Sequence, residues 1–250
     1  MHNSDTDEFY IGYAPRPPRG IARTILRAVI AVNALAVAVA GVLVSAQQPF
    51  PRTVFEFQQY RDFTGMIEMK PYPALLVKHP GGKDYSRYLL VAPGKHGADA
   101  EVGPFESKTL SLRGSLIYRA GQTMLEVVPG SVREQPGVPV EVAEMNLGDI
   151  VVRGEIVDSK CYLGVMNPGQ TKVHRDCAAR CISGGIPPAL VTSDGLYLLV
   201  GGDGRPLGRE VLDWVGETIE VSGNARRSGE TLILWAEPAN FRRDATKTLQ

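Results

Sequence analysis

The three cysteines of the chain and one of its four histidines lie in one short stretch, in the order Cys161, His174, Cys177 and Cys181. Their spacing is Cys-x12-His-x2-Cys-x3-Cys. Three thiols and an imidazole form a four-ligand set for a soft or borderline metal, and zinc, copper and iron all accept thiolate ligands. The sequence therefore predicts a metal site with these four residues as ligands, without choosing among the three metals.

Two local elements must position these ligands. A helix that is capped by Thr171 and ends at Gly184 would carry the last three ligands at i, i+3 and i+7, within roughly 60° of one another on one face. Cys161 follows a strand-like run and would approach that face from outside. Asp158, in the same run, could accept a hydrogen bond from the second ring nitrogen of the histidine, as carboxylates beside metal-bound histidines do. We therefore expect Asp158 to support the site without being a ligand.

Two other interpretations of the cysteines stay open. Outside the cytoplasm, three cysteines are compatible with one disulfide and one free thiol, and Cys161 could pair with Cys177 or Cys181. A thiol–disulfide exchange protein is the other alternative, because the histidine and the basic Arg175 and Arg180 could lower a thiol pKa. No Ser/His/Asp arrangement, phosphate-binding loop or paired-carboxylate motif is present. The sequence thus predicts no catalytic residue and favours a non-enzymatic role.

An apolar run of 19 residues, 28–46, carries no charge and is long enough to cross a bilayer as a helix. Arginines precede it at positions 16, 19, 23 and 27, and the next charged residue is Arg52. The positive-inside rule then places residues 1–27 in the cytoplasm and residues 47–250 outside. Cleavage after Ala46 as a signal peptide is the alternative, but the run exceeds the usual 7–15 residues. The run is therefore predicted to be an uncleaved transmembrane signal-anchor.

The remaining chain contains matching segments in the same order, such as Tyr88-Leu-Leu-Val91 and Tyr197-Leu-Leu-Val200. Each copy has about five short strands, estimated from its period-2 runs and glycines. This pattern resembles the oligonucleotide/oligosaccharide-binding (OB) barrel. The predicted fold is mainly β: one N-terminal transmembrane helix, a stalk, and two tandem OB-like small β-barrel domains. Their predicted boundaries are 47–60 for the stalk, 61–135 for the first domain and 147–243 for the second.

The second copy carries an insertion. Gly65 and Pro73 are 8 positions apart in the first copy, whereas the matching Gly154 and Pro188 are 34 apart, so the second copy has 26 extra residues. This insertion, at about 159–184, contains every cysteine of the chain. Because the first copy dispenses with it, the barrel does not require it, and we expect it to carry the function.

The stretch Asp158-x-Lys-Cys-Tyr … His174-x-x-Cys-Ala-x-x-Cys … Gly-Ile-Pro-Pro resembles a motif of bacterial envelope proteins that have no assigned activity. The resemblance covers about 35 residues of the second copy and implies an envelope location. The chain is then expected to be an inner-membrane protein with periplasmic barrels, acting as an accessory or redox-linked metal-binding subunit beside another envelope protein. A scaffold whose cysteines form a structural disulfide is the alternative. With 27 basic and 27 acidic residues, the chain lacks the net positive charge that would favour binding to nucleic acid.

Overall fold

The computed structural model describes residues 18–47, 52–79, 85–137 and 142–243. The chain has two parts, residues 1–50 and 51–250, which are described separately. The first contains one helix, α1 (Arg19–Ala46), whose 28 residues extend over about 42 Å. No side chain of α1 is buried, and the helix is long and apolar enough to cross a membrane.

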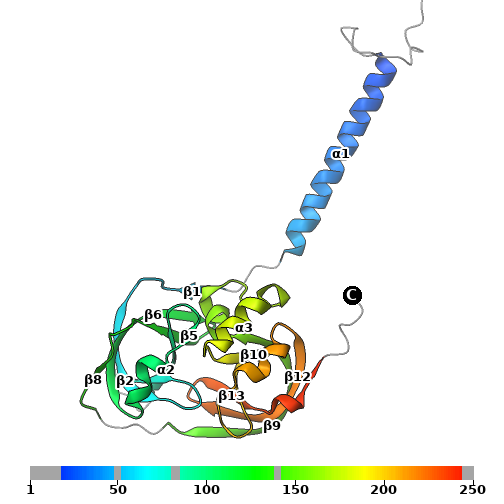
Figure 1. Ribbon diagram of the computed structural model, residues 1–250. Coiled ribbons are helices and arrows are strands. Elements are labelled where there is room, and N and C mark those ends of the chain that lie inside the picture. The colour runs from blue at the N-terminus through cyan, green and yellow to red at the C-terminus, as the bar shows by residue number, and fades with distance from the viewer. Residues whose placement is uncertain (1–17, 48–51, 80–84, 138–141, 244–250) are drawn as a thin grey trace, which may run out of the picture. The chain divides into compact units, whose positions relative to one another are not determined.

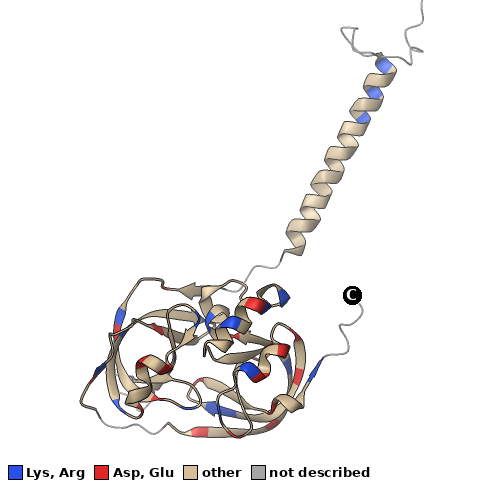
Figure 2. Cartoon of the chain, in the orientation of Figure 1, with Lys and Arg blue, Asp and Glu red and all other residues tan. Residues whose placement is uncertain are grey.

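Helix α1 begins nine residues before the predicted span of 28–46. Its first turns therefore carry Arg19, Arg23 and Arg27, and the rest of the helix has no charged residue, as Figure 2 shows. The predicted cytoplasmic segment 1–27 otherwise lies largely outside the described residues, as does part of the predicted stalk, 48–51.

The second part is mainly β and contains two closed five-stranded barrels (Figure 1). In the first barrel, β6 pairs with β2, β2 with β3, β3 with β4, β4 with β7, and β7 again with β6. Only the β4–β7 pair is parallel among these five. The elements of this half are β1 (Thr53–Phe55), β2 (Arg61–Glu68), β3 (Ala74–Lys78), β4 (Tyr85–Ala92), β5 (His96–Gly97), α2 (Asp99–Val102), η1 (Gly103–Phe105), β6 (Thr109–Arg119), β7 (Gln122–Val127) and β8 (Arg133–Glu134).

The second barrel has the same pairing scheme. Strand β12 pairs with β9, β9 with β10, β10 with β11, β11 with β13, and β13 again with β12. The single parallel pair of the ring is β11–β13. The elements of this half are β9 (Glu144–Asp158), η2 (Cys161–Val165), η3 (Lys172–His174), α3 (Arg175–Ser183), β10 (Pro188–Thr192), β11 (Leu196–Val200), η4 (Arg209–Trp214), β12 (Thr218–Ser228), β13 (Thr231–Trp235), η5 (Pro238–Asn240) and β14 (Phe241–Arg243).

Alternating side chains fill the barrels, as expected from the period of a strand. Along β6 and β12 every second residue is buried over most of the strand. A glycine lets the barrel wall bend sharply: a side chain at Gly114 of β6 would begin 2.7 Å from the Glu126 carbonyl oxygen of β7. Gly223 of β12 faces the Trp235 carbonyl of β13 in the same way.

Three hydrophobic clusters hold the second part together. One fills the first barrel around Leu75, and another fills the second barrel around Leu190. The third lies between the barrels, where Ile117 of β6 packs in one cluster with Leu198 of β11 and Leu163 of the insertion. The two barrels therefore form one compact unit with its own cores.

Two boundaries differ from expectation. Strand β1, Thr53–Phe55, lies in the segment predicted as a stalk and pairs with β6. Its Phe55 is partly buried against the cluster between the barrels, which explains why these residues join the sheet. Strand β9 begins at Glu144, three residues before the predicted start of the second domain, because it follows β12 as far as Ser228.

Candidate metal centre

The cysteines lie in the connection between β9 and β10, residues 159–187, which contains η2, η3 and α3 (Figure 1). The matching connection of the first barrel, between β2 and β3, has only residues 69–73. Cys161 begins η2, a single π-helical turn, a form of helix often found at functional sites. The first barrel holds this turn: Arg119 of β6 donates to the Tyr162 carbonyl at 3.0 Å and stacks on the Tyr162 ring.

The helix is shorter than predicted. Thr171 has a positive φ of 72° and makes no side-chain cap, and a 3-10 turn, η3, follows it. The α-helix itself begins at Arg175, so that His174 lies just outside it and does not share one helix face with Cys177 and Cys181. The predicted end is correct, because α3 stops at Ser183 and Gly184 is its C-terminal cap.

The structure divides the predicted ligands between two groups that overlap at Cys161. The Sγ atoms of Cys161, Cys177 and Cys181 lie within 4.8 Å of one another. In the second group, Cys161 Sγ, a ring nitrogen of His174 and a carboxylate oxygen of Asp158 also lie within 4.8 Å of one another. All three cysteines have free thiols. Either group is close enough to hold a metal ion.

Asp158 is fixed from two sides. Its Oδ1 accepts a hydrogen bond from the Cys161 backbone N–H at 2.8 Å, and its Oδ2 lies 3.1 Å from Nε2 of His174. Both side chains are buried, with Asp158 fully enclosed and His174 only 8% exposed. The contact that the sequence suggested between these residues is therefore present, and the carboxylate that makes it is held rigidly.

Lys95, which sequence analysis did not single out, also contacts the thiols. It lies in the turn between β4 and β5 of the first barrel, and its Nζ is 2.8 Å from Cys177 Sγ and 3.5 Å from Cys181 Sγ. A residue 82 positions away in the sequence thus brings a positive charge to the cysteines. Only the packing of the barrels reveals this contact, because nothing in the local sequence around Lys95 indicates it.

Lys160 fixes the turn that carries Lys95. Its ammonium group donates to the carbonyls of Ala92 and Gly94, each at 2.8 Å, and forms an ion pair with Glu126 at 2.6 Å. The Lys160 side chain is 3% exposed and that of Glu126 is 15% exposed. The lysine of the Asp-x-Lys-Cys motif therefore joins the insertion to the first barrel.

The backbones of the two barrels also touch beside the cluster. Gly97 of β5 donates its N–H to the Gly184 carbonyl at 2.9 Å. A side chain on Gly184 would meet the Lys95 carbonyl oxygen directly, and one on Gly97 would meet the Gly185 carbonyl oxygen. Glycine is required here because only its small volume lets the end of α3 approach the Lys95 turn so closely.

The thiols ionise unequally. A hydrogen bond from the Cys161 thiol, assisted by the nearby Lys95 charge, lowers the pKa of Cys181 to about 7. The same hydrogen bond, together with burial and the Asp158 charge, raises the pKa of Cys161 well above its usual range. The bond to Cys177 raises the pKa of Lys95. At neutral pH the cluster therefore combines a readily ionised sulfur with a fixed cation.

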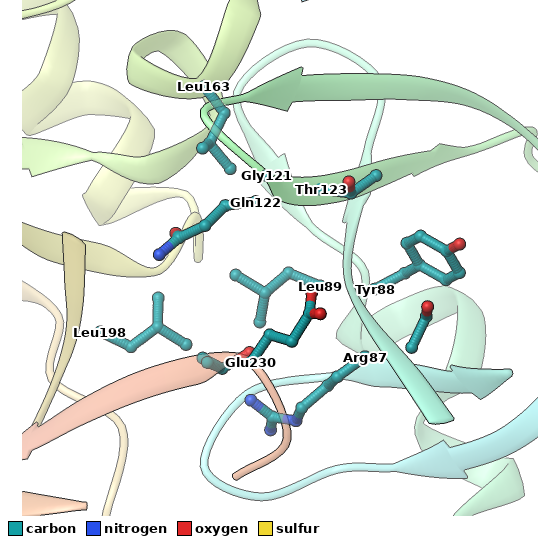
Figure 3. A pocket seen from close by; sticks show the side chains of 11 residues that line it. Arg87, Tyr88, Leu89, Gly121, Gln122, Thr123, Leu163, Leu198 and Glu230 are labelled. Atoms are coloured by element: carbon teal, nitrogen blue, oxygen red, sulfur yellow. The ribbon is translucent and has the colours of Figure 1, made fainter. Parts of the chain in front are cut away.

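A small pocket between the barrels offers a different candidate site (Figure 3). Its volume of about 80 Å³ is far smaller than that of ordinary ligand pockets. Arg87 lines it and pairs with Glu68, leaving Nη1 without a hydrogen-bond partner in the described structure. Glu230 also lines the pocket and adds a second carboxylate. These charges do not form an anion site, so the thiol cluster remains the strongest candidate.

No protein-family model, curated protein or solved structure matches the chain. The function must therefore be inferred from the site. Soft thiolate ligands and a neighbouring imidazole–carboxylate pair fit zinc, copper(I) or iron, and the burial of Cys161 and Cys181 would shield an ion from water.

Proposed function

We propose that this protein is a membrane-anchored metal-binding protein of the bacterial envelope that holds a soft or borderline ion through Cys161, Cys177 and Cys181. The observation that carries the proposal is the convergence of the three Sγ atoms within 4.8 Å on an insertion that one barrel has and the other lacks. Lys95 supports it, since an ammonium group beside the Cys177 and Cys181 sulfurs offsets part of the charge of their thiolates. His174 and Asp158 complete the polar surroundings of the site.

The proposed location and membrane orientation of the protein are based on α1. The helix is apolar and carries arginines only in its first turns, which favours a cytoplasmic N-terminus and periplasmic barrels. In this arrangement α1 is a signal-anchor, and the two barrels are OB-like units in tandem whose common pairing scheme favours an origin by duplication. Such a protein would serve another envelope protein as an accessory or redox-linked metal-binding subunit.

Elemental analysis of the purified 51–250 part, combined with a thiol count under denaturing, non-reducing conditions, tests the proposal. We expect about one or more equivalents of zinc, copper or iron per chain, and three free thiols after metal removal. The variant C181S should bind less metal than the wild type, whereas S183A, on the exposed last turn of the same helix, should bind the wild-type amount. Absence of metal together with a single free thiol would instead identify a structural disulfide and the scaffold role.

A second candidate function is thiol–disulfide exchange. Lys95 and the lowered pKa of Cys181 favour it, because the thiolate is the nucleophile in such reactions. In each cycle two thiols would become one disulfide, passing two electrons and two protons to a disulfide substrate that leaves as two thiols. Cys177, which is half-exposed and lies 2.8 Å from Nζ of Lys95, would attack the substrate disulfide, and the Cys181 thiolate would then attack the resulting mixed disulfide. Reduction of a model disulfide by the metal-free protein, abolished in C177S, would support this function.

A further inference from the structure

The two ligand groups share one sulfur, and from this we propose that the cluster holds two metal ions bridged by the Cys161 thiolate. This inference rests on the proposed metal-binding function and specifies its stoichiometry. The first ion would be held by Cys177, Cys181 and Cys161. The second would be held by His174, Asp158 and the same Cys161 sulfur.

The positions of His174 and Asp158 fit direct ligation. Bonds of about 2.0–2.1 Å in a tetrahedral site place two nitrogen or oxygen ligands about 3.3 Å apart. The observed distance from Nε2 of His174 to Oδ2 of Asp158 is 3.1 Å, so both atoms could bind one ion with little movement. The Cys161 backbone N–H already orients the carboxylate through Oδ1 and leaves Oδ2 available.

The same distances explain why His174 is separate from the first ion. The three sulfurs form a group within 4.8 Å of one another, and His174 belongs to the group that contains Cys161 but neither of the helical cysteines. This separation arises because η3, and not α3, carries His174. A single ion bound by all four predicted ligands would require a ring nitrogen of His174 to move closer to the sulfurs of Cys177 and Cys181.

The charge balance of the cluster also favours a second metal ion beside Asp158. Three thiolates, one divalent ion and the Lys95 ammonium together carry no net charge. The Asp158 carboxylate is then the remaining anion of the cluster, and it is fully buried. A buried carboxylate is stabilised by hydrogen bonds and by a nearby positive charge, and a second metal ion bound between Asp158 and His174 would supply that charge.

Zinc and cobalt(II) titrations of the reduced, tag-free protein test the inference. We expect two equivalents of zinc in the wild type, one in H174A, one in C177S and none held tightly in C161S, because only Cys161 contributes to both ions. The variant H79A, which removes an exposed histidine of the first barrel, should still bind two. Cobalt-loaded H174A should keep its thiolate-to-metal charge-transfer absorption, whereas that of C177S should weaken.

The wild type alone also decides the matter if a buried variant fails to fold. Two cobalt(II) ions bridged by one sulfur are magnetically coupled, so the second equivalent should reduce the electron paramagnetic resonance signal of the first. One equivalent at saturation, or two uncoupled ions, would overturn the bridged pair while leaving the proposed metal-binding function intact. A protein that binds no metal would overturn both.

Discussion

Replacing Lys160 by methionine removes a buried cation while keeping most of the volume of the side chain. The ammonium group makes three contacts, to Ala92, Gly94 and Glu126, at 2.6–2.8 Å. Its loss leaves Glu126, whose side chain is 15% exposed, without its partner. Breaking a buried ion pair in this way costs about 3–5 kcal/mol. We expect K160M to lower the free energy of unfolding of the 51–250 part by this amount.

The assay is urea denaturation followed by the fluorescence of Trp214 and Trp235, both in the second barrel. With an m-value of about 3 kcal/mol per molar urea, the midpoint should fall by about 1–1.7 M. The double variant K160M/E126Q should recover part of this loss, because it removes the charge that K160M leaves unpaired.

An exposed ion pair of similar length provides the control. Lys108 and Glu134 lie 2.8 Å apart, and their side chains are 47% and 53% exposed. K108M should therefore cost less than about 1 kcal/mol. If K160M costs no more than K108M, the buried lysine does not hold the barrels together and the reasoning is refuted.

Three further predictions concern the cluster. In the metal-free, reduced protein, absorbance at 240 nm should show that the Cys181 thiolate forms with a midpoint near pH 7. The variant K95M should move this titration midpoint to higher pH, because the Lys95 charge favours the thiolate. An unchanged midpoint would contradict the role of Lys95. G184A should destabilise the 51–250 part by about 1–3 kcal/mol in urea denaturation, because its new methyl group meets the Lys95 carbonyl. Zinc at 100 times its dissociation constant should stabilise the wild type by about 2.7 kcal/mol for each ion bound; C177S should gain less at the same zinc concentration, and an equal gain would exclude that thiol as a ligand.

Much of the fold could be predicted because its signals are local. The period-2 runs of β6 and β12 alternate between core and surface, and this pattern depends only on the geometry of a strand. The apolar composition of α1 and the arginines in its first turns identify it as a helix able to cross a membrane. The extra length between β9 and β10 was evident from spacing alone.

The rest depended on contacts between distant segments. The packing of the two barrels into one unit comes from side chains such as Ile117 and Leu198. An apolar residue in a strand has the same sequence pattern whether it packs inside its own barrel or against the neighbouring one, so the sequence could not predict this packing. Lys95 was missed for the same reason. The predicted start of α3 was wrong because Thr171 does not cap the helix. Its backbone has a positive φ, a conformation that a threonine rarely adopts.

The contact between Gly97 and Gly184 also limits how the chain can be divided. Lys95, which contacts the cysteines, belongs to the first barrel, as does the Ala92 carbonyl that accepts from Lys160. The thiols belong to the second barrel. A fragment that contains the second barrel alone keeps every thiol but loses its fixed cation and exposes the buried lysine to water. The smallest piece of this protein able to preserve the site is therefore the pair of barrels, and proteolytic separation of the two should abolish it.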